Sequence, residues 1–157
     1  MIRVLFVCTG NICRSPTAEA VFRRLLYDNQ LADHVEAASA GTHGYHLGEA
    51  PDRRMQRAAA RRGYDLSALR ARRVVASDIE RFDFVLAMDH ANLKALKCIA
   101  APGQGERLAL FMDYAAGFEE DEVPDPYYGA EPGFEHVLDM VEDASRGLVD
   151  RIKQEAV

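Results

Sequence analysis

The alternation of short apolar runs with helical patterns is the feature that most constrains this chain. Strand-like runs rich in β-branched and aromatic residues occupy residues 3–7, 35–40, 84–87 and 108–112. Between and after these runs, apolar residues recur at helical spacing. Strands that alternate with helices are typical of βαβ units, which bring parallel strands into one sheet. We therefore predict a three-layer α/β fold with a four-stranded parallel sheet and helices on both faces.

Capping residues indicate where the helices begin. Ser15 followed by Pro16 predicts an N-cap and a first helical residue. The spacing of Ser77 and Glu80 predicts a capping box, and Asp89 predicts a further N-cap. The predicted helical segments are 16–28, 51–63, a short helix at Ser77, 89–99 and 133–153, with loops at 42–50 and 113–132.

Length and charge exclude several classes of protein. The chain has 157 residues, of which 48% are hydrophobic, and this predicts one domain over residues 1–157 with its own core. Apolar stretches reach only strand length, so we expect no membrane span and no membrane partner. The net charge of −6 argues against nucleic-acid binding. Residues 1–73 carry a net charge of +5 and residues 74–157 one of −11, which suits either an anion site in the first half or simply an arginine-rich helix.

The cysteine content predicts reduced thiols. Cys8, Cys13 and Cys98 are too few for the disulfide framework of a secreted domain. The first residues run directly into a strand without the pattern of a signal peptide, so we expect a cytoplasmic protein. No cluster of residues has the spacing of metal ligands, and we expect neither a metal ion nor another cofactor.

The segment after the first predicted strand, residues 8–15, has the composition of an anion site with a nucleophile. Cys8 stands at the strand end, and Arg14 follows after five residues, just before a helix. A loop of this length can curl around one tetrahedral anion, with backbone N–H groups, the helix dipole and Arg14 directed inward. Gly10 allows close backbone approach, and Asn11 tolerates the left-handed conformation. The positive surroundings favour the Cys8 thiolate, which predicts phosphoryl transfer through a phosphocysteine.

Four motifs along the chain resemble those of a known family. They are Cys8-Thr9-Gly10-Asn11-Ile12-Cys13-Arg14-Ser15, Ser39-Ala40-Gly41, Ala87-Met88-Asp89 and Asp125-Pro126-Tyr127-Tyr128. Together they resemble the low-molecular-weight protein tyrosine phosphatases over nearly the whole chain. The resemblance implies a flavodoxin-like strand order 2-1-3-4 and the hydrolysis of phosphotyrosine in proteins and of small aryl phosphates, without a metal.

The resemblance also implies roles for individual residues. Cys8 is the expected nucleophile, Arg14 the phosphate ligand, Ser15 the group that stabilises the thiolate, and Asp125 the general acid and base. The residues expected to bind substrate, around either the phosphate or the aromatic ring, are Thr9, Gly10, Asn11, Ile12, Cys13, Ser15, Tyr127 and Tyr128. Tyr45 is either an opposing aromatic wall or ordinary surface packing.

Several polar residues outside these motifs have expected positions. Asn11 and Ser39 resemble family positions that hydrogen-bond to each other and hold the phosphate-binding loop rigid. Leu69 departs from the family pattern, in which a histidine often completes this network. Cys13 is either a redox partner of Cys8 or a small apolar filler, and Cys98 is predicted to be a core residue. The histidines are expected to lie in loops or on helix surfaces without a role in the site: His34, His43, His46, His90 and His136.

Three other functions fit parts of this pattern. An arsenate reductase has the same cysteine–arginine loop but needs further cysteines for a disulfide relay, and only Cys98 lies outside the loop. A phosphoarginine phosphatase carries threonine where this chain has Ile12, whose apolar side chain favours an aromatic ring. A flavin carrier has Thr9-Gly10-Asn11 in its phosphate loop, but no cysteine and arginine around the phosphate.

The expected partners follow from the tyrosine phosphatase prediction. Phosphotyrosine-containing proteins are the expected substrates, with a tyrosine kinase of polysaccharide export as one candidate. Inorganic phosphate is the expected product, and we expect the chain to be a monomer. The natural phosphoprotein and its pathway stay open.

Overall fold

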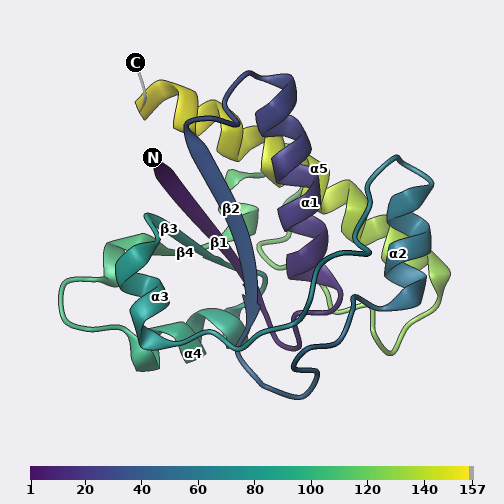
Figure 1. Cartoon of the computed structure of the whole chain (residues 1–157), viewed down its shortest axis with the longest axis horizontal. Helices are drawn as coiled ribbons and strands as arrows, with labels where there is room; N and C mark the ends of the chain where they lie inside the picture. The colour runs from purple at the N-terminus through teal and green to yellow at the C-terminus, as the bar shows by residue number, and fades with distance from the viewer. Residues whose placement is uncertain (156–157) are drawn as a thin grey trace.

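Strands and helices alternate along the chain in the computed structural model, which describes residues 1–155 (Figure 1). The strands are β1 (Ile2–Cys8), β2 (Val35–Gly41), β3 (Phe84–Ala87) and β4 (Leu108–Leu110). The α-helices are α1 (Arg14–Asp28), α2 (Arg53–Ala60), α3 (Ala76–Arg81), α4 (His90–Ile99) and α5 (Glu131–Glu155). Two short 3-10 helices, η1 (Gly105–Arg107) and η2 (Phe111–Tyr114), flank β4.

The strands form one parallel sheet in the order β2-β1-β3-β4, which confirms the predicted topology. β1 pairs with β2 along its whole length, from Ile2 opposite Val35 to Cys8 opposite Gly41. On its other side β1 pairs with β3. β4 ends at Leu110, two residues earlier than predicted, because the chain turns there into η2.

Successive side chains of β1 point to opposite faces of the sheet, and both faces are covered by helices. Val4 and Phe6 belong to the core formed with α1, α2 and α5, whereas Leu5 and Val7 belong to the core formed with α3 and α4. All four side chains are fully buried. Phe6 also packs edge to face against Phe22 of α1, with 5.5 Å between the ring centroids. This arrangement confirms the predicted three layers.

The cap of α1 differs from the prediction. The helix begins at Arg14, and its N-cap residue is Cys13 rather than Ser15. The hydroxyl of Ser15 lies 3.0 Å from the sulfur of Cys8, inside the first turn of the helix. The prediction of a Ser15 cap is wrong because this side chain contacts the neighbouring strand end instead of its own helix.

Two predictions for the α3 and α4 layer are also wrong. α3 begins at Ala76, before Ser77, and its N-cap residue is Val75, whose backbone N–H donates to the carboxylate of Asp78 at 2.8 Å. Cys98 is exposed on α4 and is not a core residue. Leu96, two positions earlier, is the fully buried side chain of this helix, and a two-residue step changes the face of a helix.

The carboxyl ends of β1, β2 and β3 meet at one edge of the sheet, where ligands bind in open α/β folds. β1 ends at Cys8 between its two neighbours, so the segment that follows it lies at this edge. Gly41 at the end of β2 allows that segment to approach closely. A Cβ at residue 41 would lie 2.8 Å from the Thr9 carbonyl oxygen and 3.2 Å from the Asn11 nitrogen.

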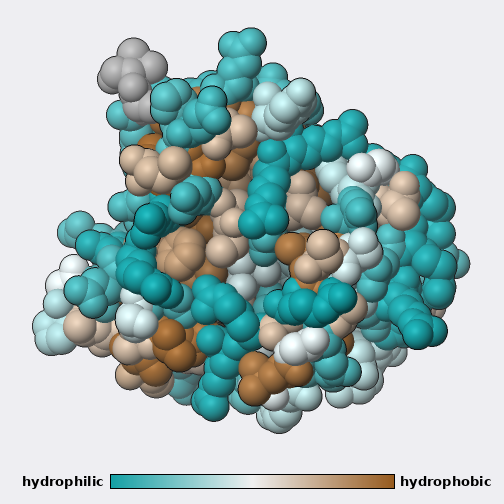
Figure 2. Space-filling model, in the orientation of Figure 1, coloured by the Kyte–Doolittle hydropathy of each residue, from teal (hydrophilic) through white to brown (hydrophobic). Residues whose placement is uncertain are grey.

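The surface mixes hydrophilic and apolar residues. Figure 2 shows the apolar residues of one face in separate patches bordered by hydrophilic ones. Tyr45 and Tyr128 are among the large hydrophobic side chains that are exposed. Within residues 1–155, no helix is both long enough and apolar enough to cross a membrane.

Candidate active site

The segment between β1 and α1, which we call the phosphate loop (residues 8–15), curls around the sulfur of Cys8. Cys8 is the last residue of β1 and is buried. Asn11 has a φ of 57°, the expected left-handed conformation, and its backbone N–H donates to Cys8 Sγ over 3.3 Å. Ser15 Oγ lies 3.0 Å from the same sulfur. These groups and the positive end of α1 all lie close to the sulfur.

The side chain of Asn11 fixes the loop through hydrogen bonds to three other residues. Its Nδ2 donates to Ser15 Oγ at 2.8 Å and to Ser39 Oγ at 3.0 Å. Its Oδ1 accepts a hydrogen bond of 2.9 Å from the backbone N–H of Arg72. Ser15 Oγ accepts from Asn11, so its own proton points either to Cys8 Sγ at 3.0 Å or to the Ala40 carbonyl oxygen at 3.4 Å. The expected contact between Asn11 and Ser39 is therefore present.

The outer part of this network ends in a buried glutamate. Ser39 Oγ donates to Glu19 Oε1 at 2.8 Å, and Arg23 pairs with Glu19 Oε2 at 2.7 Å. Burial raises the pKa of Glu19, although Arg23 and Ser39 act in the opposite direction. Leu69, at the position where the family often has histidine, packs against the hydrophobic core.

Arg14 is a buried cation at the first position of α1. Its Nη1 donates to Asp89 Oδ2 at 2.7 Å and to the Val123 carbonyl oxygen at 2.9 Å. Its Nη2 lies 3.4 Å from Thr9 Oγ1 and 3.6 Å from Asp125 Oδ2. Burial opposes the charge of Arg14, but the negative groups around it outweigh this effect and raise its pKa. The guanidinium is therefore permanently charged and fixed in orientation.

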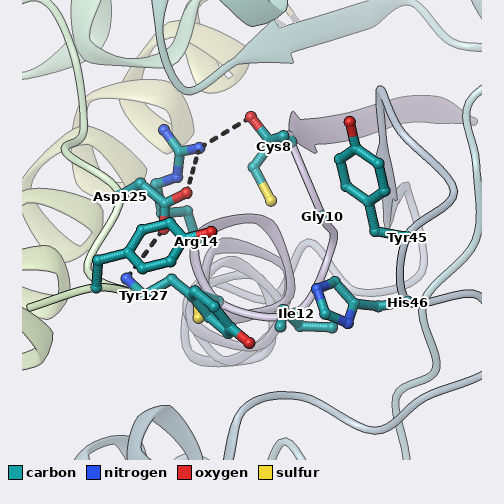
Figure 3. Close-up of a pocket in the computed structure, with 11 residues that line it drawn as sticks. Cys8, Gly10, Ile12, Arg14, Tyr45, His46, Asp125 and Tyr127 are labelled. Carbon is teal, nitrogen blue, oxygen red and sulfur yellow. Dashed lines mark hydrogen bonds and ion pairs between the residues drawn. The ribbon is translucent and has the colours of Figure 1, made fainter.

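These groups surround a pocket of about 140 Å³ at the carboxyl edge of the sheet (Figure 3). It is lined by Cys8, Thr9, Gly10, Ile12, Cys13, Arg14, Tyr45, His46, Asp125, Tyr127 and Tyr128. Figure 3 shows Asp125 and Tyr127 on one side of Cys8 and Tyr45 on the other. The fold thus brings together residues that the sequence analysis selected from opposite ends of the chain, while Asn11 and Ser15 are buried in the loop itself.

Comparison with known proteins identifies the family. The family model for low molecular weight phosphotyrosine protein phosphatase matches residues 3–157. The chain belongs to this family. A low molecular weight protein-tyrosine-phosphatase of Streptomyces coelicolor is 46% identical over 98% of this chain and 94% of its own length. The corresponding Homo sapiens protein is 36% identical over 94% of both chains. A crystal structure of a protein tyrosine phosphatase from Entamoeba histolytica has a TM-score of 0.96 and 38% identity, and covers 100% of both chains.

Family membership makes this chain an enzyme, a cysteine-dependent protein tyrosine phosphatase of low molecular weight. It confirms the identification made from the four sequence motifs and favours this class over an arsenate reductase, a phosphoarginine phosphatase or a flavin carrier. The strand order of the phosphatase fold is likewise confirmed by its structural relatives.

His46 is a pocket residue that the sequence analysis missed. Its Nδ1 lies 2.7 Å from Glu49 Oε2, and its ring centroid lies 5.9 Å from that of Tyr127. Tyr45 beside it lines the pocket and stacks on His43 at 5.0 Å. The signal that could have found His46 is its place in the loop after β2, whose carboxyl end lies next to that of β1. His46 lies in a loop, as predicted, but its place in the pocket lining was not predicted.

Asp89 has two functions at the carboxyl end of β3. Its Oδ1 accepts a hydrogen bond of 2.8 Å from the Asn92 N–H and so caps α4, as predicted. Its Oδ2 binds Arg14, a contact that the sequence analysis did not predict. Asn92 Nδ2 also donates to Thr9 Oγ1 at 3.0 Å. The start of α4 therefore supports both ends of the phosphate loop.

Cys13 is a buried free thiol in the lining of the pocket, and Cys8 is free as well. Burial, together with Asp52 and Cys8, raises the pKa of Cys13 and keeps its thiol protonated. A protonated, buried thiol agrees with the small apolar filler, and the redox role stays a prediction. Among residues 1–155, no three His, Cys, Asp or Glu side chains are grouped so that they could hold a metal ion.

Proposed function

We propose that this phosphatase hydrolyses phosphotyrosine in proteins, and small aryl phosphates, through a phosphocysteine on Cys8. Asp125 is the proposed general acid and base. The observation that supports this best is the shared pocket, in which Asp125 Oδ2 lies 3.6 Å from Arg14 Nη2 and both face Cys8 (Figure 3). A phosphate held there has a nucleophile on one side and a proton donor on the other.

The phosphoryl group is bound by the phosphate loop in this proposal. The backbone N–H groups of Thr9, Gly10, Ile12 and Cys13 are the proposed donors to its oxygens, with the positive end of α1 behind them, while the Asn11 N–H donates to Cys8 Sγ. Arg14 contributes a planar pair of N–H groups, which suits two phosphoryl oxygens. Donors fixed in this way stabilise the charge that develops on the oxygens in the transition state.

The first step transfers the phosphoryl group to the enzyme. The thiolate of Cys8 attacks phosphorus, so that an S–P bond forms while the bond from phosphorus to the tyrosine oxygen breaks. The departing oxygen takes its proton from Asp125, which becomes a carboxylate. In this proposal the Ser15 hydroxyl, 3.0 Å from the sulfur, donates a hydrogen bond to it and so stabilises the thiolate before the attack.

The second step releases inorganic phosphate. The Asp125 carboxylate accepts a proton from a water molecule, whose oxygen attacks phosphorus. The S–P bond breaks, and its electron pair returns to Cys8 as the thiolate. The enzyme regains its starting state because Asp125 is protonated again.

Aromatic walls explain the preference for phosphotyrosine. Tyr127 and Tyr128 are the proposed contacts with the substrate ring, and their own rings pack edge to face at 4.9 Å. Tyr45 lies across the pocket from Tyr127, and Ile12 offers an apolar contact at the loop. These exposed walls suit a phosphotyrosine in an accessible segment of a protein, for which a tyrosine kinase that carries such residues is one candidate.

We further propose a cytoplasmic monomer that acts without nucleic acid, membrane or cofactor. The mechanism requires Cys8 as a free thiol, and reducing compartments keep thiols free. The pocket is assembled from residues of one chain, so that a second copy is not needed to complete it.

Hydrolysis of 4-nitrophenyl phosphate in the presence of EDTA tests the proposal. We expect the parent enzyme to be active and Cys8→Ser to lose about 10⁴-fold or more in kcat, because the nucleophile is removed. Cys98→Ser is the matched control, since Cys98 is exposed and lies outside the pocket, and it should keep full activity. Rapid acid quench followed by mass spectrometry should find phosphate on Cys8. Activity that requires a metal, or that survives Cys8→Ser, would contradict the mechanism.

A further inference from the structure

The acid loop, which we define as residues 123–129, carries Asp125 and is anchored on its N-terminal side by the site itself. The N–H of Val123 donates to the Met88 carbonyl oxygen at 2.7 Å. The Val123 carbonyl accepts from Arg14 Nη1 at 2.9 Å, and Val123 is fully buried. The Asp125 side chain, in contrast, is 42% exposed. Its position therefore depends on what holds the loop on the other side.

Arg54 of α2 provides the second anchor. Its Nη2 donates to the Tyr127 carbonyl oxygen at 2.8 Å, and its Nη1 lies 3.5 Å from the Gly129 carbonyl oxygen. The guanidinium also lies over the ring of Phe134 at 4.8 Å and over that of Tyr127 at 5.7 Å. Phe134 is fully buried in the first turns of α5. One side chain thus joins the end of the acid loop to two helices.

Arg54 is itself held by Asp52, which is connected to the phosphate loop. Asp52 Oδ1 accepts from Arg54 Nε at 3.2 Å, and Oδ2 accepts from Arg54 Nη2 at 2.9 Å. The backbone N–H of Asp52 donates to the Ile12 carbonyl oxygen at 2.8 Å. The same carboxylate caps α2. Asp52 and Arg54 therefore link the phosphate loop to the acid loop by a continuous set of hydrogen bonds.

Tyr127 transmits this contact to the general acid. Its carbonyl is bound by Arg54, and its N–H donates to Asp125 Oδ1 at 3.1 Å. Asp125 Oδ2 is then the oxygen that points toward Arg14, at 3.6 Å from Nη2. The orientation of Asp125 follows from the position of Tyr127, and Arg54 sets that position.

We propose that Arg54 is a positioning residue of the phosphatase reaction, which holds the acid loop so that Asp125 delivers its proton to the leaving oxygen. This inference rests on the proposed role of Asp125 as general acid. Arg54 does not line the pocket, so it acts through Tyr127 and not on the substrate. Its loss should impair protonation of the leaving group and leave phosphate binding intact.

Arg54→Met tests the inference, because methionine keeps an apolar contact with Phe134 but removes every donor. We expect kcat/KM to fall about tenfold on phenyl phosphate, whose leaving group needs a proton, and about twofold or less on 4-nitrophenyl phosphate. Across a series of aryl phosphates, log(kcat/KM) should decline more steeply with the pKa of the leaving phenol. The inhibition constant of inorganic phosphate should stay within about twofold of the parent value, because the phosphate loop is unchanged.

Two further variants keep the test decisive. Arg54→Lys retains the charge but loses the planar pair of donors, and it should steepen the same slope to a smaller degree. It carries the test by itself if Arg54→Met does not fold. Arg57→Met changes an exposed arginine further along α2 that lies outside the pocket, and it should keep the parent slope. Thermal unfolding of each variant checks that the fold is intact.

Asp125→Asn, measured in parallel, separates failure of this inference from failure of the proposed function. If Asp125→Asn steepens the slope and the Arg54 variants do not, the positioning role is wrong while the general acid stands. If Asp125→Asn leaves the slope unchanged, the proposed general acid is wrong and the inference with it. Weaker phosphate inhibition with an unchanged slope would show that Arg54 merely supports the phosphate loop. Combined with Asp125→Asn, Arg54→Met should cause no additional loss, because both act on one proton transfer.

Discussion

The phosphate loop and the acid loop face the same pocket but are held in different ways. In the phosphate loop, Cys8 and Arg14 are each 2% exposed and Ser15 is fully buried. In the acid loop, the Asp125 side chain is 42% exposed and Tyr128 is 93% exposed. The first loop lies between a central strand and a helix, whereas the second extends over the surface between two anchors.

The two loops therefore depend on different parts of the chain for their conformation. The phosphate loop takes its shape from its neighbours in sequence, namely the end of β1, the left-handed Asn11 and the start of α1. The acid loop takes its position from distant residues, among them Met88, Arg14 and Arg54. Substitutions in the first should therefore affect binding and stability together. Substitutions in the second should mainly affect proton transfer.

The largest effect is expected in the phosphate loop, from Arg14→Lys. Lysine keeps the charge, but all its donors lie on one nitrogen, so it lacks the planar pair with which Arg14 binds Asp89 and Val123 through Nη1 and faces the pocket with Nη2. We expect kcat/KM on 4-nitrophenyl phosphate to fall by about 1,000-fold, with weaker inhibition by inorganic phosphate. The melting temperature should also fall, because a buried ion pair is disturbed. Near-parental kinetics would show that a simple positive charge suffices and that the comparison overstates the role of geometry.

A smaller and more selective effect is expected in the acid loop, from Asp125→Asn. Asparagine cannot supply the proton, so kcat/KM on phenyl phosphate should fall by about 100-fold, and less on 4-nitrophenyl phosphate. The melting temperature should stay close to that of the parent, because the side chain is substantially exposed. A large loss of stability would mean that the two loops are not held as differently as their exposure indicates.

The smallest effect is expected at Asp78, which binds Arg72 next to the phosphate loop. This buried carboxylate pairs with Arg72 at 3.1 Å and Arg81 at 3.3 Å, and the backbone N–H of Arg72 binds Asn11 of the loop. Burial opposes the charge of Asp78, but its hydrogen bonds and Arg72 outweigh this and hold its pKa below the ordinary value. The ionised form thus stabilises the fold above the unfolded-state pKa of about 4, and this contribution is lost as pH falls through the lower folded-state pKa.

Asp78→Asn should therefore lower the free energy of unfolding by about 1–3 kcal/mol at pH 7, measured by urea denaturation. The difference from the parent should begin to shrink below about pH 4, as Asp78 of the parent becomes protonated. Asp33→Asn, at an exposed carboxylate, serves as the control and should change little at either pH. A difference that stays constant into acid would assign the loss to packing and not to the charge of Asp78.

Much of the fold and the centre of the site could be predicted because their signals are contiguous. The run that forms β1, the curl from Cys8 to Arg14 and the helix after it lie within one short stretch of chain. Strand periodicity and the positions of Gly10 and Asn11 act locally, so that neighbouring residues suffice to recognise them. The Asp-Pro motif predicts Asp125 as a site residue, although nothing near it in sequence indicates what holds its loop.

The errors share one physical reason. Local pattern assigns Ser15, Ser77 and Cys98 to caps or to the core, but the packing of each helix against its neighbours decides where the helix begins and which face is buried. His46 is indicated only by its place in the loop after β2, and Arg54 has no distinctive local signal. Their importance arises from contacts across the fold, with Tyr127 in both cases.

The sequence by itself determined the α/β architecture, the phosphate loop and the class of chemistry, because periodicity, capping and a nucleophile beside a helix start are local properties. Only the tertiary structure decided how the pocket is lined and supported. Asp89, His46 and Arg54 come from three different loops or helix starts, and they meet the phosphate and acid loops because parallel strands end at one edge of the sheet. Which side chains converge at that edge depends on packing and hydrogen bonds between segments distant in sequence, and no local pattern contains that information.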